Sequence, residues 1–205
     1  MVVRPPPRPF QPQVEELPGG AELYRVHHAS RSAAEFNPGV GSPTRFAFFG
    51  SPRVPILYAA ATEQAAIAET LLHDVPQSGG RLVAFEYEGR QASRLLTTRK
   101  LRLGAFLGLG LRKLGVNADE LTITGAAEYG ATVDWAEAAH TAGLDGVVYM
   151  SRQSNSDRVY AFFGDRSEDA FTVDSRYEWR FDDVGGGRDK LITLCNPLGV
   201  EVLLR

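Results

Sequence analysis

The sequence predicts an α+β domain whose core is a mixed or antiparallel sheet with flanking helices. Segments with the composition of strands outnumber those with helical periodicity. The two kinds do not alternate regularly, which argues against a doubly wound α/β fold. The chain has 205 residues, 43% of them hydrophobic, which suits one domain with a sizeable core. We therefore expect one folded domain, with any extension confined to an end of the chain.

The first part of the chain predicts a strand, a loop and then a strand that leads into a helix. Ala21–Ala29 alternates in polarity and predicts a strand. A segment rich in glycine and proline follows and encloses a short aromatic strand at Arg45–Phe49. Pro55–Ala60 predicts a buried strand, and Thr62 is a suitable N-cap for a helix over Glu63–His73.

The second part of the chain continues the mixture of strands and helices. The stretch at 101–116 contains four glycines among apolar residues, so its pattern leaves helix and strand both open. The other expected elements are a strand at Arg81–Gly89, a helix at 131–143 that ends near Gly143, strands at 144–151 and 158–164, and a closing segment at 174–196 with a glycine-rich turn.

The proline-rich start of the chain, "MVVRPPPRPFQPQVEELPGG", differs from the rest. Proline fixes φ and removes a backbone donor, so the stretch favours an extended conformation. We interpret residues 1–18 as an extended N-terminal arm and residues 19–205 as a single domain. The arm is expected either to be disordered, as many termini are, or to pack on a partner subunit.

Composition and charge exclude several functional classes. A formal net charge of −3 argues against direct binding of nucleic acid, which favours a basic surplus. Cys195 is the only cysteine, so no intramolecular disulfide can form, and no Cys/His spacing indicates a metal site. No apolar run is long enough to span a membrane, and the proline-rich start is not a secretory signal. We therefore expect a cytoplasmic protein.

Two glycine-containing stretches do not fit nucleotide-binding motifs. "GLGLRKLG", residues 108–115, lacks the G-x-G-x-x-G spacing of the dinucleotide fingerprint. "GVGSPTR", residues 39–45, lacks the G-K-[ST] ending of a P-loop. Any nucleotide site in this chain must therefore be built differently.

The carboxylate of Glu69 is the most informative side chain of the predicted helix. With 100° per residue, the apolar residues form a broad arc, and Glu69 lies at its edge, one turn after the small Ala65 and Ala66. No Lys or Arg lies three or four residues away to form an ion pair, and His73 at i+4 is a weaker partner. Glu69 is therefore either a solvated boundary residue or part of a site.

Two arginines and a tyrosine near the helix favour the second interpretation. Arg25 lies within a strand pattern, Arg45 precedes the aromatic run "FAFF", and Tyr58 lies in the strand before Glu69. Arginine binds phosphates bidentately, and a tyrosine ring can stack on a base or a pyridine ring. Together these residues predict a pocket for a ligand that is both anionic and aromatic.

The order of these residues resembles the RES domain family. The resemblance runs through "LYRV", "RFAFFG", "ILYAAATEQAAIAETLLHD" and "GLDGVVYMSR", roughly residues 21–165. The Arg, Tyr and Glu of the family match Arg25, Tyr58 and Glu69, and its Ser matches Ser151. Arg45 matches an Arg that commonly precedes Trp, where this chain has Phe46.

The resemblance implies a fold like that of ADP-ribosyltransferases and a catalytic domain at residues 19–205. Many RES proteins are toxins of bacterial toxin–antitoxin pairs that consume NAD, and their antitoxins are helix-turn-helix proteins of the Xre type. The resemblance therefore implies that this chain cleaves the nicotinamide–ribose bond of NAD, by hydrolysis or by phosphorolysis. It also implies an Xre-type antitoxin partner and a homodimer, with NAD as substrate and no metal.

The resemblance also implies a role for each candidate residue. Arg25 and Arg45 would hold the pyrophosphate and ribose side of NAD, and Tyr58 would pack on the nicotinamide. Glu69 would stabilise the positive charge on the ribose or orient the attacking group, since preorganised charge is typically worth about 10²–10³ in rate.

The roles of two further residues are open. Ser151 would bind the ligand or orient Glu69. His27 or His28 would contact the ribose, but adjacent residues of a strand face opposite sides, so only one of the two can face a pocket; we expect His27.

Two other functions remain open from the sequence. Some relatives transfer ADP-ribose to a protein acceptor, which requires the same hold on NAD. A nucleotide-binding module without catalysis is the third alternative, and the joint presence of Arg25, Arg45, Tyr58 and Glu69 argues against it.

Overall fold

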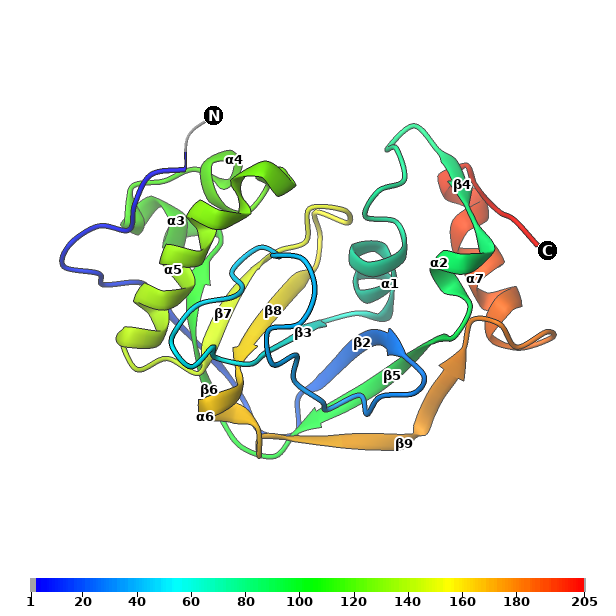
Figure 1. The fold of residues 1–205 in the computed structure, drawn as a ribbon, viewed down its shortest axis with the longest axis horizontal. Helices are drawn as coiled ribbons and strands as arrows, with labels where there is room; N and C mark the ends of the chain where they lie inside the picture. Colours follow the sequence, from blue (N-terminus) through cyan, green and yellow to red (C-terminus); the bar gives the residue numbers. More distant parts are fainter. Residues whose placement is uncertain (1–2, 205) are drawn as a thin grey trace.

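Eight strands form one curled sheet, and a computed structural model describes it over residues 3–204. The strand order is β1-β6-β7-β8-β3-β2-β5-β9, and every neighbouring pair is antiparallel except the parallel pair β6 and β7. A small parallel pair, β4 and β10, lies beside this sheet at one end of the molecule (Figure 1). The predicted α+β fold with a mixed or antiparallel sheet is confirmed, and the sheet is mixed with one parallel pair.

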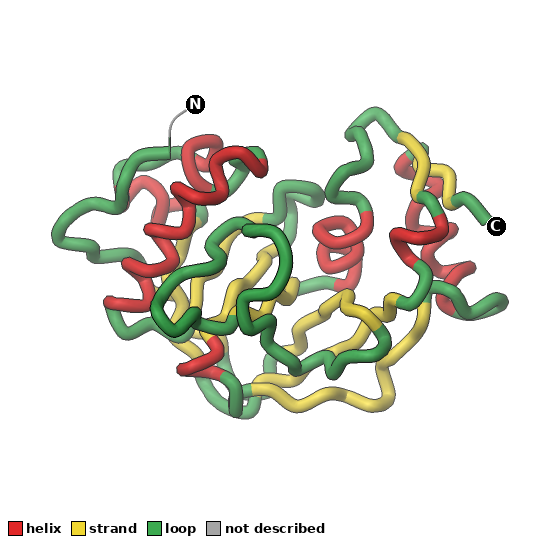
Figure 2. The backbone as a smooth tube through the Cα atoms, viewed as in Figure 1, coloured by secondary structure: helices red, strands yellow, loops and turns green. Residues whose placement is uncertain are grey.

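The helices lie against the sheet in separate groups (Figures 1 and 2). The strands are β1 (Val14–Leu17), β2 (Glu22–His28), β3 (Ile56–Ala60), β4 (Gly80–Leu82), β5 (Arg90–Thr97), β6 (Leu101–Phe106), β7 (Gly146–Met150), β8 (Arg158–Phe163), β9 (Phe171–Arg180) and β10 (Val200–Val202). The helices are α1 (Glu63–Leu71), α2 (Ala84–Tyr87), α3 (Gly108–Leu114), α4 (Ala118–Leu121), α5 (Tyr129–Thr141), α6 (Gly164–Ser167) and α7 (Gly187–Cys195), with 3₁₀ turns η1 (Ala126–Glu128) and η2 (Asn196–Leu198).

The sheet is nearly split between β2 and β3. β2 pairs with β5 along its whole length, from Glu22 to His28, and β3 pairs with β8 from Ile56 to Ala60. β2 and β3 pair with each other only at Tyr24 and Ala60. Because the two strands diverge from that point, the sheet opens into a gap that side chains from both strands can reach.

Helix α1 forms as its sequence predicts. The Thr62 hydroxyl accepts a hydrogen bond from the Ala65 amide at 3.2 Å and caps the first turn. The apolar arc of the helix is buried in the larger of two hydrophobic cores and includes Ala65, Ile67 and Leu71. Buried side chains of α5 and β7 belong to the same core. Glu69, at the edge of that arc, is left half-buried.

The predicted aromatic strand at Arg45–Phe49 is wrong. Phe46 has φ of +67°, and Thr44 and Ala47 pair with each other, so the chain turns tightly here instead of extending. Phe46 and Ala47 are fully buried and Phe49 nearly so. The run of aromatic residues therefore reflects a loop that is packed into the core, which resembles a strand in sequence because its side chains are apolar.

The predicted strand at Arg81–Gly89 is also wrong, because β4 ends at Leu82 and the short helix α2 follows. In a strand Phe85 and Tyr87 would face the same side. The helical turn separates them: Phe85 is 80% exposed, whereas Tyr87 is buried and donates a hydrogen bond to the Leu203 carbonyl at 2.9 Å. The strand that follows α2 is β5, which the sequence pattern did not predict.

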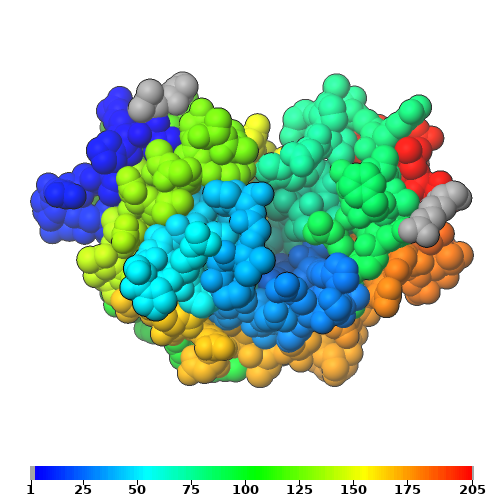
Figure 3. Space-filling view, viewed as in Figure 1, coloured from blue at the N-terminus to red at the C-terminus, as the bar shows by residue number. Residues whose placement is uncertain are grey.

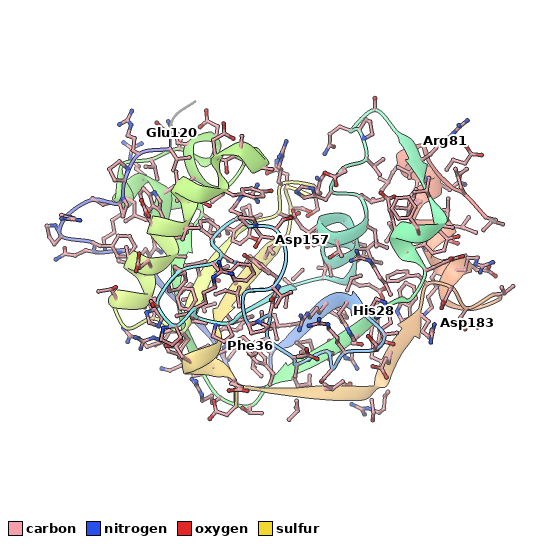
Figure 4. The ribbon with its side chains drawn as sticks, in the orientation of Figure 1. His28, Phe36, Arg81, Glu120, Asp157 and Asp183 are labelled. Carbon is pink, nitrogen blue, oxygen red and sulfur yellow. The ribbon has the colours of Figure 1, made fainter. Side chains whose placement is uncertain are left out.

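The remaining differences concern the element boundaries and the arm. The ambiguous stretch 101–116 contains strand β6 followed by helix α3, and the helix predicted at 131–143 is α5, shifted by two residues. Within the described residues the arm packs on its own domain, because β1 pairs with β6 and the Trp135 indole donates to the Arg4 carbonyl at 2.8 Å. In Figure 4 Glu120 lies close to this arm, and its carboxylate pairs with Arg4 at 3.3 Å.

The longest helix described in residues 3–204, α5, has 13 residues, and none of the helices there is long and apolar enough to cross a membrane.

Candidate active site

A cavity of about 500 Å³ lies at the gap between β2 and β3. It is bounded by the loop before β3, by one face of α1 and by the start of α5. The space-filling view shows the molecule hollowed between the light-blue loop near residue 40 and the teal segment after α1 (Figure 3). Four of the predicted site residues line it: Arg25, Arg45, Tyr58 and Glu69.

A hydrogen bond from Ser151, which does not line the cavity, fixes the Glu69 carboxylate. The Ser151 hydroxyl donates a hydrogen bond to Glu69 Oε1 at 2.6 Å, and the Gln153 amide donates to the same oxygen at 3.2 Å. The backbone amides of Gln153 and Ser154 donate to the Ser151 Oγ at 3.2 and 3.0 Å. Because Oγ accepts these two hydrogen bonds, the Ser151 hydroxyl proton is directed to Glu69. One carboxylate oxygen is therefore fixed, and the side chain faces the cavity from a defined position.

Ser151 comes to this position because it follows β7 directly. The strand ends at Met150, and the turn after it places successive amides around the Ser151 oxygen. Ser151 is 1% exposed. It does not line the cavity itself and reaches it only through Glu69.

Arg45 is a buried cation whose nearest partners are uncharged. It is 5% exposed, and its Nη2 donates to the Thr124 carbonyl at 2.8 Å. The guanidinium lies 5.2 Å from the centre of the Tyr129 ring and 5.9 Å from that of Tyr149, which is the geometry of a cation–π contact. In residues 3–204 its Nε has no hydrogen-bond partner and no carboxylate forms an ion pair with it. A buried charge without a counter-ion costs stability, so this position suits an anionic ligand.

Tyr58 fixes the backbone that carries Arg45. Its hydroxyl donates to the Arg45 carbonyl, and the Thr44 hydroxyl lies 3.0 Å away on the other side. Since the single Tyr58 proton goes to the carbonyl, Thr44 is the donor in the second contact. Burial raises the pKa of Tyr58, so the phenol is neutral and serves as a hydrogen-bonding and stacking group.

Arg25 holds the loop that closes one side of the cavity. Its Nη1 donates to the carbonyls of Ala33 and Glu35 at 2.6 and 2.7 Å. Burial lowers its pKa to about 10, which still leaves the guanidinium charged at neutral pH. Part of the donor capacity of Arg25 is therefore used for the loop at 29–37, which also contributes Asn37 to the cavity.

His27 lies apart from the other predicted site residues. Its Nε2 is 2.9 Å from the Ser93 Oγ, in a buried polar cluster with Gln91, and it does not line the cavity. His28 is exposed and lies at the end of β2 (Figure 4). His27 is thus buried and His28 exposed, and neither lines the cavity.

Several residues that line the cavity were not predicted as site residues, and Tyr149, Tyr129 and His73 are the three that carry aromatic or basic rings close to Arg45 or Glu69 in space or in sequence. Tyr149 and Tyr129 flank Arg45, and His73 lies four residues after Glu69, just beyond the end of α1. The sequence contains a weak indication of Tyr149, because it lies two residues before Ser151, which follows the same strand directly. The sequence contains no indication of Tyr129, because this residue comes close to the other site residues only through the packing of α5.

The donor set of the described residues does not form a metal site. Within residues 3–204, no group of three His, Cys, Asp or Glu side chains converges as metal ligands would. The cavity combines cations, tyrosines and one fixed carboxylate, which suits an anionic organic ligand better than a metal ion.

Comparisons with known proteins identify a family and a similar fold. Residues 22–183 match the family described as the RES domain. Among solved structures, the crystal structure of the M. tuberculosis MbcT–MbcA toxin–antitoxin complex contains a similar chain, with a TM-score of 0.56 and 13% identity. The similarity covers 80% of this chain and 86% of that one, and at this identity it concerns the fold. No curated protein sequence matches the chain.

Proposed function

Because this chain belongs to the RES domain family, we propose that it is an NAD-consuming toxin that cleaves the bond between nicotinamide and ribose. The observation that carries the proposal is the pairing in one cavity of a fixed carboxylate, Glu69, with a buried arginine that lacks a counter-ion, Arg45. NAD offers the matching groups, since it carries an anionic pyrophosphate next to the ribose whose bond is broken.

The first part of the mechanism is the binding of NAD. Arg45, whose Nε has no partner in residues 3–204, would donate to the pyrophosphate and gain the counter-ion that it lacks. The Tyr58 ring would pack on the nicotinamide, and Arg25 would contribute charge and hold the loop at 29–37 closed. Binding in this orientation would place the nicotinamide–ribose bond near Glu69.

The second part of the mechanism is the breaking of the bond. The electron pair of the C1–N bond goes to the pyridinium ring, which leaves as neutral nicotinamide, and the ribose acquires positive charge. The Glu69 carboxylate would stabilise that charge, and the hydrogen bond from Ser151 keeps it in place. Ser151 would therefore be a positioning residue for Glu69 and not a nucleophile, since no His or Asp among residues 3–204 forms a hydrogen bond with its hydroxyl.

The proposal includes partners and location. By analogy with the MbcT–MbcA toxin–antitoxin complex, we propose an antitoxin partner, of the Xre type that the family resemblance implies, which covers the cavity entrance. A homodimer, a cytoplasmic location and residues 19–205 as the catalytic domain belong to the same proposal. Light scattering that gave a single-chain mass at micromolar concentration would exclude the dimer.

The test is loss of NAD with the purified chain, with and without inorganic phosphate, and with products resolved by mass. Appearance of ADP-ribose identifies hydrolysis, and ADP-ribose-1″-phosphate identifies phosphorolysis. Glu69→Ala should lower the rate by about 10²–10³ or more. Glu137→Gln, which changes an exposed carboxylate on α5, is the matched control and should keep the wild-type rate.

Absence of NAD loss in the wild type would reject the proposal. ADP-ribose transferred to an added protein, with little loss of NAD in its absence, would instead identify the chain as an ADP-ribosyltransferase. Binding of NAD without any product would identify a non-catalytic module.

A further inference from the structure

Three polar side chains form a chain at the mouth of the cavity. His73 Nδ1 lies 2.8 Å from Asp74 Oδ1, and His73 Nε2 lies 3.2 Å from the Tyr129 hydroxyl. All three residues line the same cavity as Glu69. None of them has a part in the mechanism described so far, apart from the ring of Tyr129 beneath Arg45.

The contacts of His73 determine which of its nitrogens carries the proton. An ionised carboxylate only accepts hydrogen bonds, so Nδ1 must be the donor to Asp74. In the neutral ring the lone pair is then on Nε2, where the Tyr129 hydroxyl donates to it. Asp74 therefore orients an imidazole whose basic nitrogen points to the cavity side, toward Tyr129.

The position of His73 suits a group that exchanges a proton with the cavity. His73 lies two residues beyond Leu71, the last residue of α1, and lines the same cavity as Glu69. The His73 side chain is 35% exposed, so a proton that it accepts can pass to solvent. His73 is also held in place from Gln153, whose side-chain amide donates to its carbonyl at 3.1 Å.

We propose that His73 is the general base that activates an acceptor water during NAD hydrolysis, which rests on the proposed function. The water would take the position at Nε2 that the Tyr129 hydroxyl holds in this structure. Its oxygen bonds to C1 of the ribose while the C1–N bond breaks and its electron pair leaves with nicotinamide. One water proton passes to His73 Nε2, and the products are ADP-ribose, nicotinamide and one proton that is released to solvent.

The proposal separates the two possible acceptors. Water must lose a proton as it attacks, so its reaction needs a base. Hydrogen phosphate dianion already carries a nucleophilic oxygen and keeps its proton in the product, so its reaction does not. Loss of His73 should therefore lower hydrolysis much more than phosphorolysis.

The experiment compares His73→Gln and His73→Ala with the wild type, with water alone and with inorganic phosphate. Glutamine can still donate to Asp74 and accept from Tyr129, but it cannot take up a proton, so it keeps the hydrogen-bonded link and removes the base. We expect hydrolysis to fall about 100-fold or more in both variants, with the KM for NAD unchanged within about threefold. Phosphorolysis should fall less than about threefold, and added imidazole should restore hydrolysis in His73→Ala.

His140→Gln is the matched control. His140 also pairs with a carboxylate, Asp165, at 2.7 Å, but it packs against Phe49 and Phe163 outside the cavity lining. This variant should keep both reactions. Thermal unfolding of all three variants verifies that each is folded.

Four results would overturn the inference. Wild-type hydrolysis in His73→Gln would show that His73 acts only as a link between α1 and α5. An equal loss of hydrolysis and phosphorolysis would show a general effect on the site. If the wild type performs phosphorolysis but no hydrolysis, no water is activated and His73 is not a general base. In these three cases the proposed function stands, whereas a wild type that does not cleave NAD with either acceptor would reject both.

Discussion

The Ser151 hydroxyl lies 2.6 Å from Glu69 Oε1 and connects the end of β7 to the middle of α1. The two residues are 82 positions apart in the sequence. The Ser151 oxygen accepts two backbone amides, so its proton is directed to the carboxylate. The orientation of Glu69 therefore depends on the turn after β7 as well as on its own helix.

Removing the Ser151 hydroxyl should slow the reaction without weakening NAD binding. A hydrogen bond to a charged group is worth about 1.5–3 kcal/mol, so Ser151→Ala should lower kcat by about 10- to 150-fold. The KM for NAD should change by less than about threefold, because Ser151 does not line the cavity. Steady-state kinetics on the purified variant measure both quantities.

Ser151→Thr keeps a hydroxyl and is the matching control. It should recover part of the lost kcat if the buried site accommodates the extra methyl group. If Ser151→Ala has a higher KM for NAD than the wild type and the same kcat, Ser151 contacts the substrate directly instead of positioning Glu69.

The candidate site was predictable where a residue lies in a patterned element. Glu69 interrupts the apolar arc of a helix without a local ion pair, and Arg25 lies inside a strand pattern, so both have an anomaly that can be read from the sequence. His73 is four residues from Glu69 in the sequence but interrupts no pattern, and Tyr129 has no indication of any kind. Tyr129 reaches the site only because α5 meets the end of α1 at the cavity, which depends on long-range packing.

The fold was predictable for the same reason, and the errors have a common cause. The β2 strand and the α1 helix each have a clear period and a clear boundary, such as the Thr62 cap. The two wrongly predicted strands are a buried turn at Arg45–Phe49 and, at Arg81–Gly89, a helical turn that buries Tyr87 and exposes Phe85. In segments this short, the same pattern of side chains fits a strand and a turn, so it cannot identify the backbone conformation.

Replacing Arg45 by an apolar side chain should stabilise the ligand-free protein while it abolishes activity. Arg45 is 5% exposed, and no carboxylate among residues 3–204 forms an ion pair with it, so the folded state carries the cost of burying a charge. Arg45→Met should raise the free energy of unfolding by about 1–2 kcal/mol, after allowance for the lost contacts with the two tyrosine rings. For a domain of this size, each 1 kcal/mol corresponds to about 2–4 °C in Tm.

The measurement is thermal unfolding with and without inorganic pyrophosphate. Pyrophosphate should raise the Tm of the wild type by mass action and leave that of Arg45→Met unchanged. Arg53→Met, on an exposed arginine that donates to the Gly39 carbonyl, is the control and should respond to pyrophosphate as the wild type does. Equal stabilisation of all three proteins would show that the anion binds elsewhere.

The stability of the protein should fall below about pH 6.5 because of His27. Burial lowers the pKa of His27 from its usual 6.5, and the neighbouring Arg25 cation lowers it further. The unfolded chain therefore binds a proton at a higher pH than the folded protein does. The contribution of His27 to stability is fully present above pH 6.5 and is lost as the pH falls from there toward the lowered pKa of the folded state.

Urea unfolding between pH 7.5 and pH 5 measures this effect in the wild type, His27→Gln and His28→Gln. His27→Gln removes the group that titrates and should have a flatter dependence of the unfolding free energy on pH. His28, which is exposed and bonds to Ser30, should leave the slope as it is in the wild type. If both variants have the wild-type slope, the pH dependence comes from other groups and not from the buried cluster around Ser93.

The N-terminal arm should contribute to the stability of its own domain through Phe10 and Trp135. The two rings make an edge-to-face contact with centroids 6.3 Å apart and planes at 75°. The Trp135 indole also donates to the Arg4 carbonyl at 2.8 Å, and Trp135 is fully buried with the arm in place. Phe10→Ala should lower the free energy of unfolding by about 1–2 kcal/mol, from the lost ring contact and the lost apolar burial.

Trp135 fluorescence provides a local measurement of the same change. With Phe10 removed the indole should become more accessible, so its emission should shift to longer wavelength in Phe10→Ala, whereas Phe10→Leu keeps an apolar cover and should shift less. Trp179, which is half-buried and bonds to Glu63 at 2.6 Å, contributes a constant background. If Phe10→Ala keeps wild-type stability and emission but lowers the mass measured by light scattering, Phe10 contributes to contacts between subunits, because a contact within one chain would not change the mass.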